Sequence, residues 1–220
     1  MQKGTSRLVI LVASVAVLVA GLMVVLSQIG GGGDPRELFA DIPQNGPRLG
    51  QEDAPVTIQL YEDSQYPACA QFIRETFPQV VEQYVEPGEV RVVSEPLAFL
   101  GPDSVPAARA AVAAGEQDRY WQYAYRRFEN QGAENSGYVT DEFLTDIAEN
   151  TEGLDVNRWN EARDSEVVEE ELEAAREMAI EDEIEATPTL VVSGPGGERK
   201  LRGAVPMEEV EAAVEEVKAG

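Results

Sequence analysis

The most regular hydrophobic pattern in the chain is an apolar run close to its N-terminus. From Leu8 to Ile29 no side chain is charged, and a helix of that length, at about 1.5 Å per residue, spans roughly 33 Å. This length is sufficient for a hydrocarbon core of about 30 Å, so the run predicts a transmembrane helix. Lys3 and Arg7 precede it, and the first charged residue after it is Asp34. This asymmetry predicts a cytoplasmic N-terminus, with the rest of the chain on the extracytoplasmic side of the cell membrane.

A cleavable signal peptide is the alternative interpretation of the same run. A site at Val19-Ala20-Gly21 is conceivable, but apolar residues continue through Leu26 and no A-x-A motif closes the run. We therefore expect an uncleaved signal anchor, in which residues 1–29 form a short cytoplasmic tip and a single-pass transmembrane helix.

A polar segment separates this run from the next hydrophobic pattern. Gly30 to Gly33 predict a flexible hinge, and residues 34–54 combine acidic residues and prolines with few large apolar side chains. We interpret residues 30–54 as an acidic tether and expect the folded domain at residues 55–220.

The domain begins with a strand, a helix and a second strand. Residues 54–61 alternate between apolar and polar side chains, which is typical of a strand, and residues 72–84 have helical spacing. Pro78 falls inside the helical pattern and predicts a kink. Residues 89–94 predict another strand, so this unit implies a parallel pair.

Helical spacing dominates from about residue 103 to residue 184. Thr140 is placed to cap a helix that runs through Ile147, and Ser165 is placed to begin another. An aromatic stripe between Trp121 and Phe128 fits a ligand box, but packing inside a helical subdomain explains it better. The run Glu169-Glu170-Glu171 is interpreted as a solvated helix face and not as a metal site.

Two strands and a helix complete the pattern. Thr189 to Ser193 and Arg199 to Arg202 flank a Gly-Pro-Gly-Gly turn and predict an antiparallel hairpin. Pro206 then opens a last helix. The order is therefore a βαβ half, a helical block and a ββα half.

Charge and composition exclude several functional classes. The chain has 17 Lys and Arg against 41 Asp and Glu, a net charge of -24, so it repels phosphate backbones and is not expected to bind nucleic acid. It lacks histidine, which excludes Ser-His-Asp and Cys-His catalysis and imidazole zinc sites. Its single cysteine excludes a disulfide within the chain. We expect neither a metal nor a cofactor. The acidity fits either a protein that faces concentrated salt or a compositional drift of the genome.

Three segments together resemble the DsbA-like branch of the thioredoxin superfamily. Leu49 to Phe72 is similar to the entry strand and redox loop of the family, Ala107 to Gln131 to its helical insertion, and Ala186 to Val192 to its cis-proline loop. The resemblance extends over nearly all of residues 48–218. It implies an α/β, thioredoxin-like fold with a helical insertion at about 103–184 between the βαβ half and the ββα half, here preceded by one N-terminal transmembrane helix. It also implies membership of the thiol–disulfide oxidoreductase family.

The chain departs from this family at the redox loop. The family usually has Cys-Pro-x-Cys there, whereas this chain has Tyr66-Pro67-Ala68-Cys69, so the resemblance places Tyr66 at the first cysteine and Cys69 at the second. A dithiol cycle needs both, because one thiolate must attack the mixed disulfide that the other has formed. Whether the chain is an enzyme is therefore open.

Two interpretations of Cys69 follow. It is either a small buried apolar residue in the first turn of the helix, or a monothiol that pairs with a cysteine of a client. The buried interpretation is preferred, because a cysteine at the second position is normally shielded from solvent.

The resemblance also implies a cis bond at Thr187-Pro188 and a peptide site beside it. In the family, the backbone before the cis-proline holds an extended substrate peptide next to the redox loop. That mode of binding uses main-chain hydrogen bonds and does not need the missing cysteine. We therefore expect Tyr66, Pro67, Thr187 and Pro188 to bind peptide.

Two functions remain after these exclusions. The first is a redox-inactive, membrane-anchored relative that binds extracytoplasmic polypeptide clients. The second is a thiol–disulfide exchange enzyme restricted to monothiol chemistry, for which Cys69 is the candidate catalytic residue.

Overall fold

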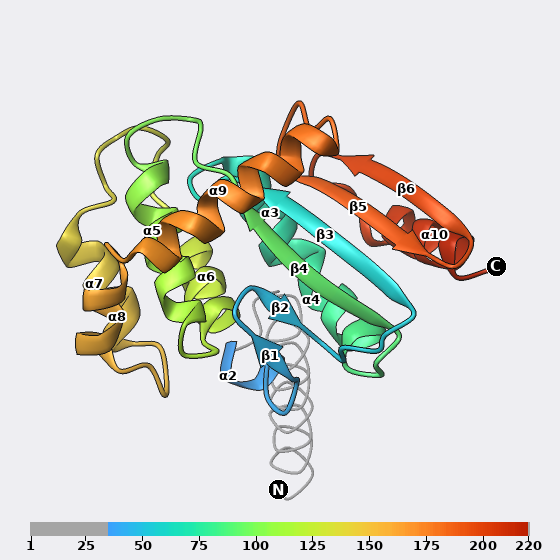
Figure 1. The fold of residues 1–220 in the computed structure, drawn as a ribbon, viewed down its shortest axis with the longest axis horizontal. Coiled ribbons are helices and arrows are strands. Elements are labelled where there is room, and N and C mark those ends of the chain that lie inside the picture. Colours follow the sequence, from blue (N-terminus) through green and yellow to red (C-terminus); the bar gives the residue numbers. More distant parts are fainter. Residues whose placement is uncertain (1–34, 220) are drawn as a thin grey trace, which may run out of the picture. The chain divides into compact units, whose positions relative to one another are not determined.

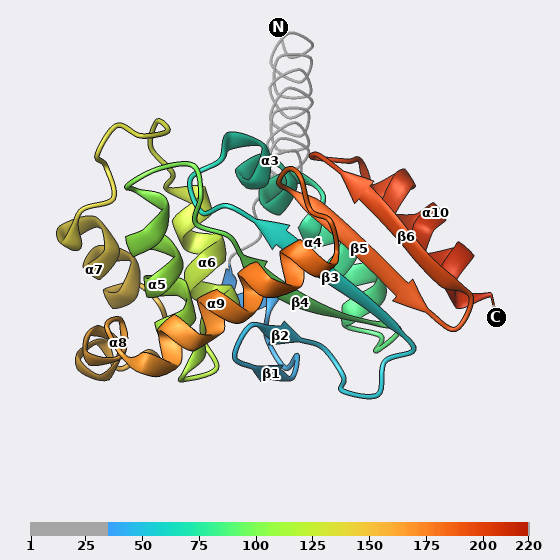
Figure 2. The same ribbon diagram turned by 45° about the horizontal axis from the view of Figure 1, so that its top comes forward.

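A computed structural model describes residues 35–219 of the chain, and these residues form a central sheet with helices on both of its faces (Figures 1 and 2). The sheet has six strands in the order β1-β2-β4-β3-β5-β6. Their bounds are Gln44–Asn45 for β1, Arg48–Leu49 for β2, Val56–Glu62 for β3, Val90–Pro96 for β4, Thr189–Gly194 for β5 and Gly197–Arg202 for β6.

From α3 onward the helices follow the predicted order, whereas α2 lies in the segment that was predicted to be a tether. Their bounds are Pro35–Leu38 for α2, Pro67–Glu75 for α3, Phe77–Val80 for α4, Ser104–Gly115 for α5, Tyr120–Glu129 for α6, Asp141–Glu149 for α7, Val156–Ala162 for α8, Glu166–Glu181 for α9 and Met207–Lys218 for α10. A π-helical turn, η1, covers Val81–Val85.

Strand pairing confirms the two predicted halves. β3 pairs with β4 in parallel, with Val56 opposite Val90, and pairs on its other side with β5 in the antiparallel sense. β5 and β6 form the predicted hairpin. β3 is therefore the strand that joins the βαβ half to the ββα half.

The two faces of the sheet are covered differently. In Figures 1 and 2, α9 crosses one face, whereas α3, α4 and α10 lie on the other. Leu60 of β3 belongs to the large core on the α3 side, while Tyr61 joins a small apolar cluster with Ala175 and Ala179 of α9. This alternation follows from the strand geometry, in which successive side chains point to opposite faces.

The helical insertion is confirmed as α5 to α9, and two of its helix starts are confirmed at atomic detail. The Thr140 hydroxyl accepts a hydrogen bond from the N–H of Phe143, and the Ser165 hydroxyl accepts one from the N–H of Val168. Each bond satisfies an N–H group that a helix start otherwise leaves without a partner. The aromatic stripe on α6 is buried in the core, as the packing interpretation predicted.

The helical pattern is interrupted, as predicted, but the break lies at Thr76 and not at Pro78. α3 ends at Glu75 and α4 begins at Phe77, so Pro78 occupies the first turn of a new helix. Proline is tolerated there because the N–H that it lacks has no partner within the helix at that position.

The interpretation of residues 30–54 as a tether is wrong for the described part of that segment. β1 and β2 form a hairpin whose second strand pairs with β4, and Leu49 is fully buried. Phe39 also packs in the core, against Phe77 and Trp121. Strands of two residues are too short to produce a periodic pattern, and their stability comes from pairing with β4, far along the chain.

The predicted transmembrane helix, Leu8–Ile29, lies outside the described residues. Between residues 35 and 219, no helix is long and apolar enough to cross a bilayer.

Candidate functional site

The segment from Glu62 to Cys69, called here the 62–69 loop, begins at the end of β3 and enters α3. Tyr66 is the N-cap residue of α3, with extended backbone angles of φ -76° and ψ 126°, and Pro67 occupies the first turn. Tyr66 is half-buried and Pro67 is exposed, whereas Cys69 is fully buried. The loop therefore presents Tyr66 and Pro67 at the surface and hides the thiol beneath them.

The Thr187-Pro188 peptide bond is cis, as the resemblance implied. It directly precedes β5, where Thr189 pairs with Tyr61 at the end of β3. The turn is thereby brought to the 62–69 loop, and the Thr187 side chain interacts with the Cys69 thiol. Thr187 and Pro188 are themselves buried, while the preceding Ala186 is exposed.

The Cys69 thiol lies in a poor environment for a thiolate. Burial raises the pKa of the thiol well above its usual range, and the negative charge of Glu62 raises it further. The backbone N–H of Asp63 donates to the sulfur at 3.4 Å and, together with the Thr187 contact, offsets only part of this effect. The thiol is therefore protonated at neutral pH, and little thiolate is present to attack a disulfide.

Asp63 connects the 62–69 loop to two other segments. One carboxylate oxygen accepts from the Gln65 N–H at 3.0 Å and from the Ser104 hydroxyl at 2.8 Å. The other accepts from the backbone N–H groups of Phe99, at 3.0 Å, and Leu100, at 3.2 Å. The carboxylate is fully buried and holds the loop after β4 and the start of α5 against the 62–69 loop.

Gln65 connects the same loop to the helical insertion. Its side-chain nitrogen donates to the Ser104 hydroxyl at 2.8 Å and to Asn135 Oδ1 at 3.1 Å, and its side-chain oxygen accepts from the Asn135 N–H at 2.7 Å. The Gln131 side chain donates to the Gln65 carbonyl. The loop is thus held from both sides before any ligand binds.

Glu62 and Arg127 form a buried pair of opposite charge behind the loop. Glu62 Oε2 lies 4.0 Å from Arg127 Nη2, and the Tyr120 hydroxyl donates to Glu62 Oε1 at 3.3 Å. Arg127 also donates to the Ser64 carbonyl and stacks over Phe128, with its Cζ atom 3.8 Å from the ring centroid. Burial raises the pKa of Glu62 to about 7, although Arg127 opposes that rise.

Four large apolar side chains are exposed among residues 35–219, and two of them belong to the segments that Asp63 holds. Phe99 is 56% exposed and Val105 is 37% exposed, whereas Val167 and Ile180 lie on α9. Phe99 is attached through its N–H to Asp63, so the loop gives it a fixed position. An aromatic ring held in this way can contact an apolar side chain of a bound polypeptide.

In the described chain, no three Cys, Asp or Glu residues cluster closely enough to hold a metal ion. In the acidic run on α9, Glu169 and Glu170 are exposed, as a solvated face requires, whereas Glu171 is half-buried.

Sequence reasoning identified Tyr66, Cys69 and the Thr187-Pro188 turn but missed Glu62, Asp63 and Arg127 as parts of the site. Glu62 and Asp63 stand at the end of a buried strand, and two acidic residues at such a position could have indicated a functional site. Arg127 had no such signal, because it contacts the loop from more than sixty positions away in the sequence.

Comparisons with known proteins agree with this geometry. A family model described as "Thioredoxin" matches residues 43–216. The chain is 28% identical over 199 residues to the "Probable disulfide bond formation protein D" of Bacillus anthracis, covering 88% of this chain and 91% of that protein. It is 30% identical over 149 residues to "Disulfide bond formation protein D" of Bacillus subtilis strain 168, covering 67% of each. The oxidised crystal structure of BdbD from Bacillus subtilis superimposes with a TM-score of 0.71 at 25% identity, covering 82% of this chain and all of that one.

Proposed function

We propose, from the premise that this chain belongs to the thioredoxin family and, within it, to the DsbA-like disulfide bond formation proteins, that its domain binds polypeptides without running a dithiol cycle. The observation that carries the proposal is the burial of Cys69, the one cysteine in the sequence.

Tyr66 accounts for the loss of the dithiol reaction. It precedes Cys69 by three positions, at the start of α3, which is the place of the nucleophilic cysteine in the family. A phenol has no redox chemistry at sulfur, so no mixed disulfide forms at this position. The remaining thiol is buried and protonated, which disfavours its use as a replacement nucleophile.

The polypeptide is bound in extended form beside the cis turn. Ala186 directly precedes the cis turn and is exposed, and its carbonyl already accepts from the Thr189 hydroxyl at 2.7 Å, so its N–H is the main-chain group proposed to bind the polypeptide. Phe99 supplies an apolar contact on the loop that Asp63 fixes. These groups recognise an unfolded polypeptide by its backbone and by an apolar side chain, and none of them requires a cysteine in the client.

Titration of a fluorescent, cysteine-free peptide library against the full chain tests this function. We expect weak, saturable binding that Cys69→Ser leaves within about twofold. Phe99→Ser is expected to weaken binding by about tenfold, or about 1.4 kcal/mol. Val167→Ser is the matched control, because Val167 is 54% exposed but lies on α9. Equal affinities of the Phe99 and Val167 variants would contradict the proposed surface.

Monothiol exchange at Cys69 is the second candidate, and the names of the two Bacillus relatives favour it. In that reaction the Cys69 thiolate attacks a client disulfide, one sulfur of the client joins Cys69, and the other leaves as a thiolate. A thiol from a second molecule must then displace Cys69. This function requires the buried sulfur to become accessible. Covalent capture of a disulfide-containing peptide by the unmodified chain, and its loss in Cys69→Ser, would establish it.

Restoring the dithiol motif tests the assignment of Tyr66. The Tyr66→Cys variant is expected to gain insulin-reducing activity, because a cysteine at a helix N-terminus has its thiolate stabilised by the helix dipole. Tyr66→Ser is the control and is expected to stay inactive. Dithiol turnover by the unmodified chain would contradict the proposal.

We also propose that Leu8–Ile29 anchors the domain on the extracytoplasmic side of the cell membrane, which the charges of Lys3, Arg7 and Asp34 support. Protease added to intact spheroplasts is then expected to degrade the domain. Release of a soluble domain that starts near residue 22 or 31 would instead establish cleavage of a signal peptide.

A further inference from the structure

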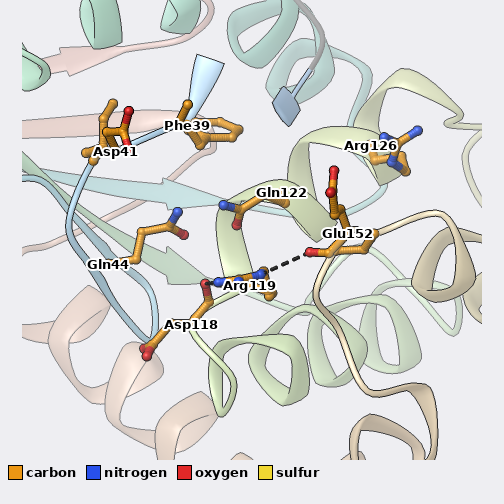
Figure 3. Close-up of a pocket in the computed structure, with 11 residues that line it drawn as sticks. Phe39, Asp41, Gln44, Asp118, Arg119, Gln122, Arg126 and Glu152 are labelled. Atoms are coloured by element: carbon orange, nitrogen blue, oxygen red, sulfur yellow. Dashed lines mark hydrogen bonds between the residues drawn. The ribbon is translucent and has the colours of Figure 1, made fainter. Parts of the chain in front are cut away.

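A cavity of about 340 Å³ lies between the segment that follows α2 and the exposed side of α6 (Figure 3). Small-molecule sites commonly have volumes of about 300–1,000 Å³, so this cavity is large enough for a ligand. It shares no residue with the 62–69 loop or with the Thr187-Pro188 turn. Gln122 and Arg126 line it from one face of α6, whereas Arg127 of the same helix contacts Ser64 in the loop.

Three buried polar atoms on the lining have no hydrogen-bond partner within the part of the chain that the structure describes. They are Gln44 Oε1, Gln122 Oε1 and Arg126 Nε. Buried polar atoms are normally paired, so three such atoms around one cavity need an explanation. Two of them accept hydrogen bonds and one donates, which suits a bound molecule that carries both a donor group and an acceptor group.

Carboxylates lie on both sides of the cavity, but the two sides differ. Figure 3 shows Asp41, Gln44 and Asp118 toward one side and Arg126 and Glu152 toward the other, with Arg119 between them. A cation is favoured on the first side, where two carboxylates lie, and the unpaired Nε–H of Arg126 on the second side requires a hydrogen-bond acceptor such as a carboxylate.

The total charge of the lining is close to balanced. Two arginines, Arg119 and Arg126, face three carboxylates, the third of which is Glu152. A ligand with a single net charge gains little from such a surface, whereas a ligand that carries one charge of each sign gains at both ends.

The walls of the cavity are held in place by the fold itself. Arg119 donates to the Glu152 carbonyl at 3.0 Å and to the Asp118 carbonyl at 2.8 Å. Gly153 packs so closely that a Cβ atom there would lie 2.8 Å from Arg119 Nη2. Asp41 and Asp118 have φ values of 60° and 55°, in the left-handed region that side chains other than glycine rarely adopt. Such conformations are often found where a fold supports a binding site.

We propose that this cavity binds a small zwitterion of the free amino acid or dipeptide class. The ammonium group of the ligand faces Asp41, Gln44 and Asp118, and its carboxylate faces Arg126. This binding is separate from the proposed polypeptide site, so either can fail without the other.

Isothermal titration of the full chain, purified in a non-ionic detergent, tests the proposal with glycylglycine and with glycine. We expect saturable binding of at least one of the two at one site per chain. Glycinamide, which has only the positive charge, and N-acetylglycine, which has only the negative charge, are expected to bind at least about tenfold more weakly. Equal affinity of either single-charge probe, or no saturable heat with both zwitterions, would overturn the proposal.

Variants locate the binding at this cavity. Gln122→Leu and Arg126→Leu are each expected to weaken zwitterion binding at least about tenfold. Arg176→Leu is the control, because Arg176 is an exposed arginine of α9 that pairs with Glu173. Arg126→Lys, which keeps the charge and removes the donor at Nε, covers the case in which the leucine variant fails to fold, and it is also expected to weaken binding. Unchanged affinity in folded Gln122 and Arg126 variants would place the ligand elsewhere and overturn the assignment.

Discussion

Glu62 Oε2 lies 4.0 Å from Nη2 of Arg127, and the two side chains are only 2% and 0% exposed. This separation is too long for a direct hydrogen bond, and neither atom has another hydrogen-bond partner in the described structure. Arg127 therefore stabilises Glu62 by compensating its charge and not by a direct hydrogen bond. It holds the back of the 62–69 loop, because Arg127 also donates to the Ser64 carbonyl.

Removing the arginine should destabilise the domain strongly. Arg127→Met leaves Glu62 buried without its opposite charge, and breaking such a pair commonly costs about 3–5 kcal/mol. Arg176→Met is the control, since Arg176 and Glu173 form an exposed pair whose loss costs at most about 1 kcal/mol. Urea denaturation at pH 8, where the folded Glu62 is ionised, measures both values. Similar costs for the two variants would show that Glu62 and Arg127 do not depend on each other.

The stability of the domain should fall as the pH rises from about 4.5 to about 7. An unfolded Glu62 loses its proton near pH 4.5, whereas the folded residue keeps it until about pH 7. In that window the folded state binds more protons than the unfolded state, so the free energy of unfolding decreases with pH, by up to about 1.4 kcal/mol per pH unit for one such group. Buried Glu95, whose pKa is also raised to about 7 by burial and then by Glu171, adds a second contribution of the same sign.

Glu62→Gln separates these contributions. The variant should have a shallower dependence of unfolding free energy on pH between about 4.5 and 7, with the remaining slope due to Glu95 and other groups. Glu170→Gln, at an exposed position of α9, should keep the full slope. The measurement is urea denaturation at a series of pH values. An unchanged slope in Glu62→Gln would mean that Glu62 is ionised in the folded protein throughout this range.

Cys69 should resist alkylation while the domain is folded. Its thiol is fully buried and its pKa is raised, first by burial and then by the charge of Glu62. Iodoacetamide at pH 8 should therefore modify it only slowly, and fully once urea is added. A Cys69→Ala, Val167→Cys double variant supplies an exposed thiol for comparison. Comparable rates for the two thiols would favour the monothiol function. Glu62→Gln should increase the rate for Cys69, because it removes the charge that opposes the thiolate.

Asp63 should be required for the shape of the polypeptide site. Asp63→Ala removes the two carboxylate oxygens that accept four hydrogen bonds. The donors are the Ser104 hydroxyl and the backbone N–H groups of Gln65, Phe99 and Leu100. Hydrogen bonds to charged groups contribute about 1.5–3 kcal/mol each, so the variant should lose at least about 3 kcal/mol of stability.

The same variant should also affect binding. Peptide affinity in folded Asp63→Ala should fall at least as much as in Phe99→Ser, because the loop that carries Phe99 is released. Asp146→Ala, at an exposed carboxylate position that contacts Asn150, is the control. Full peptide affinity in Asp63→Ala would show that the loop keeps its position without the carboxylate.

The order of the elements could be predicted because their signals are local. The alternation in residues 54–61, the caps at Thr140 and Ser165, and the glycine-rich turn before β6 each depend on neighbours a few positions away. The parallel pairing of β3 with β4 then follows from the short helical connection between them.

The contacts that define the site could not be predicted in this way. Arg127 reaches Ser64, Asn135 reaches Gln65, and β2 reaches β4 only after the chain has folded back on itself. The residues involved are polar or lie in strands of two residues, so neither periodicity nor capping indicates their partners.

The sequence by itself determined the fold class, the helical insertion and the presence of one cysteine at the start of α3, because these depend on local pattern and on residue identity. Only the tertiary structure decided that Cys69 is buried beside Glu62, that Asp63 holds the Phe99 loop, and that a cavity with charges of both signs lies along α6. The physical reason is that burial, and with it the pKa of a thiol or carboxyl group, is set by residues brought together from distant parts of the chain.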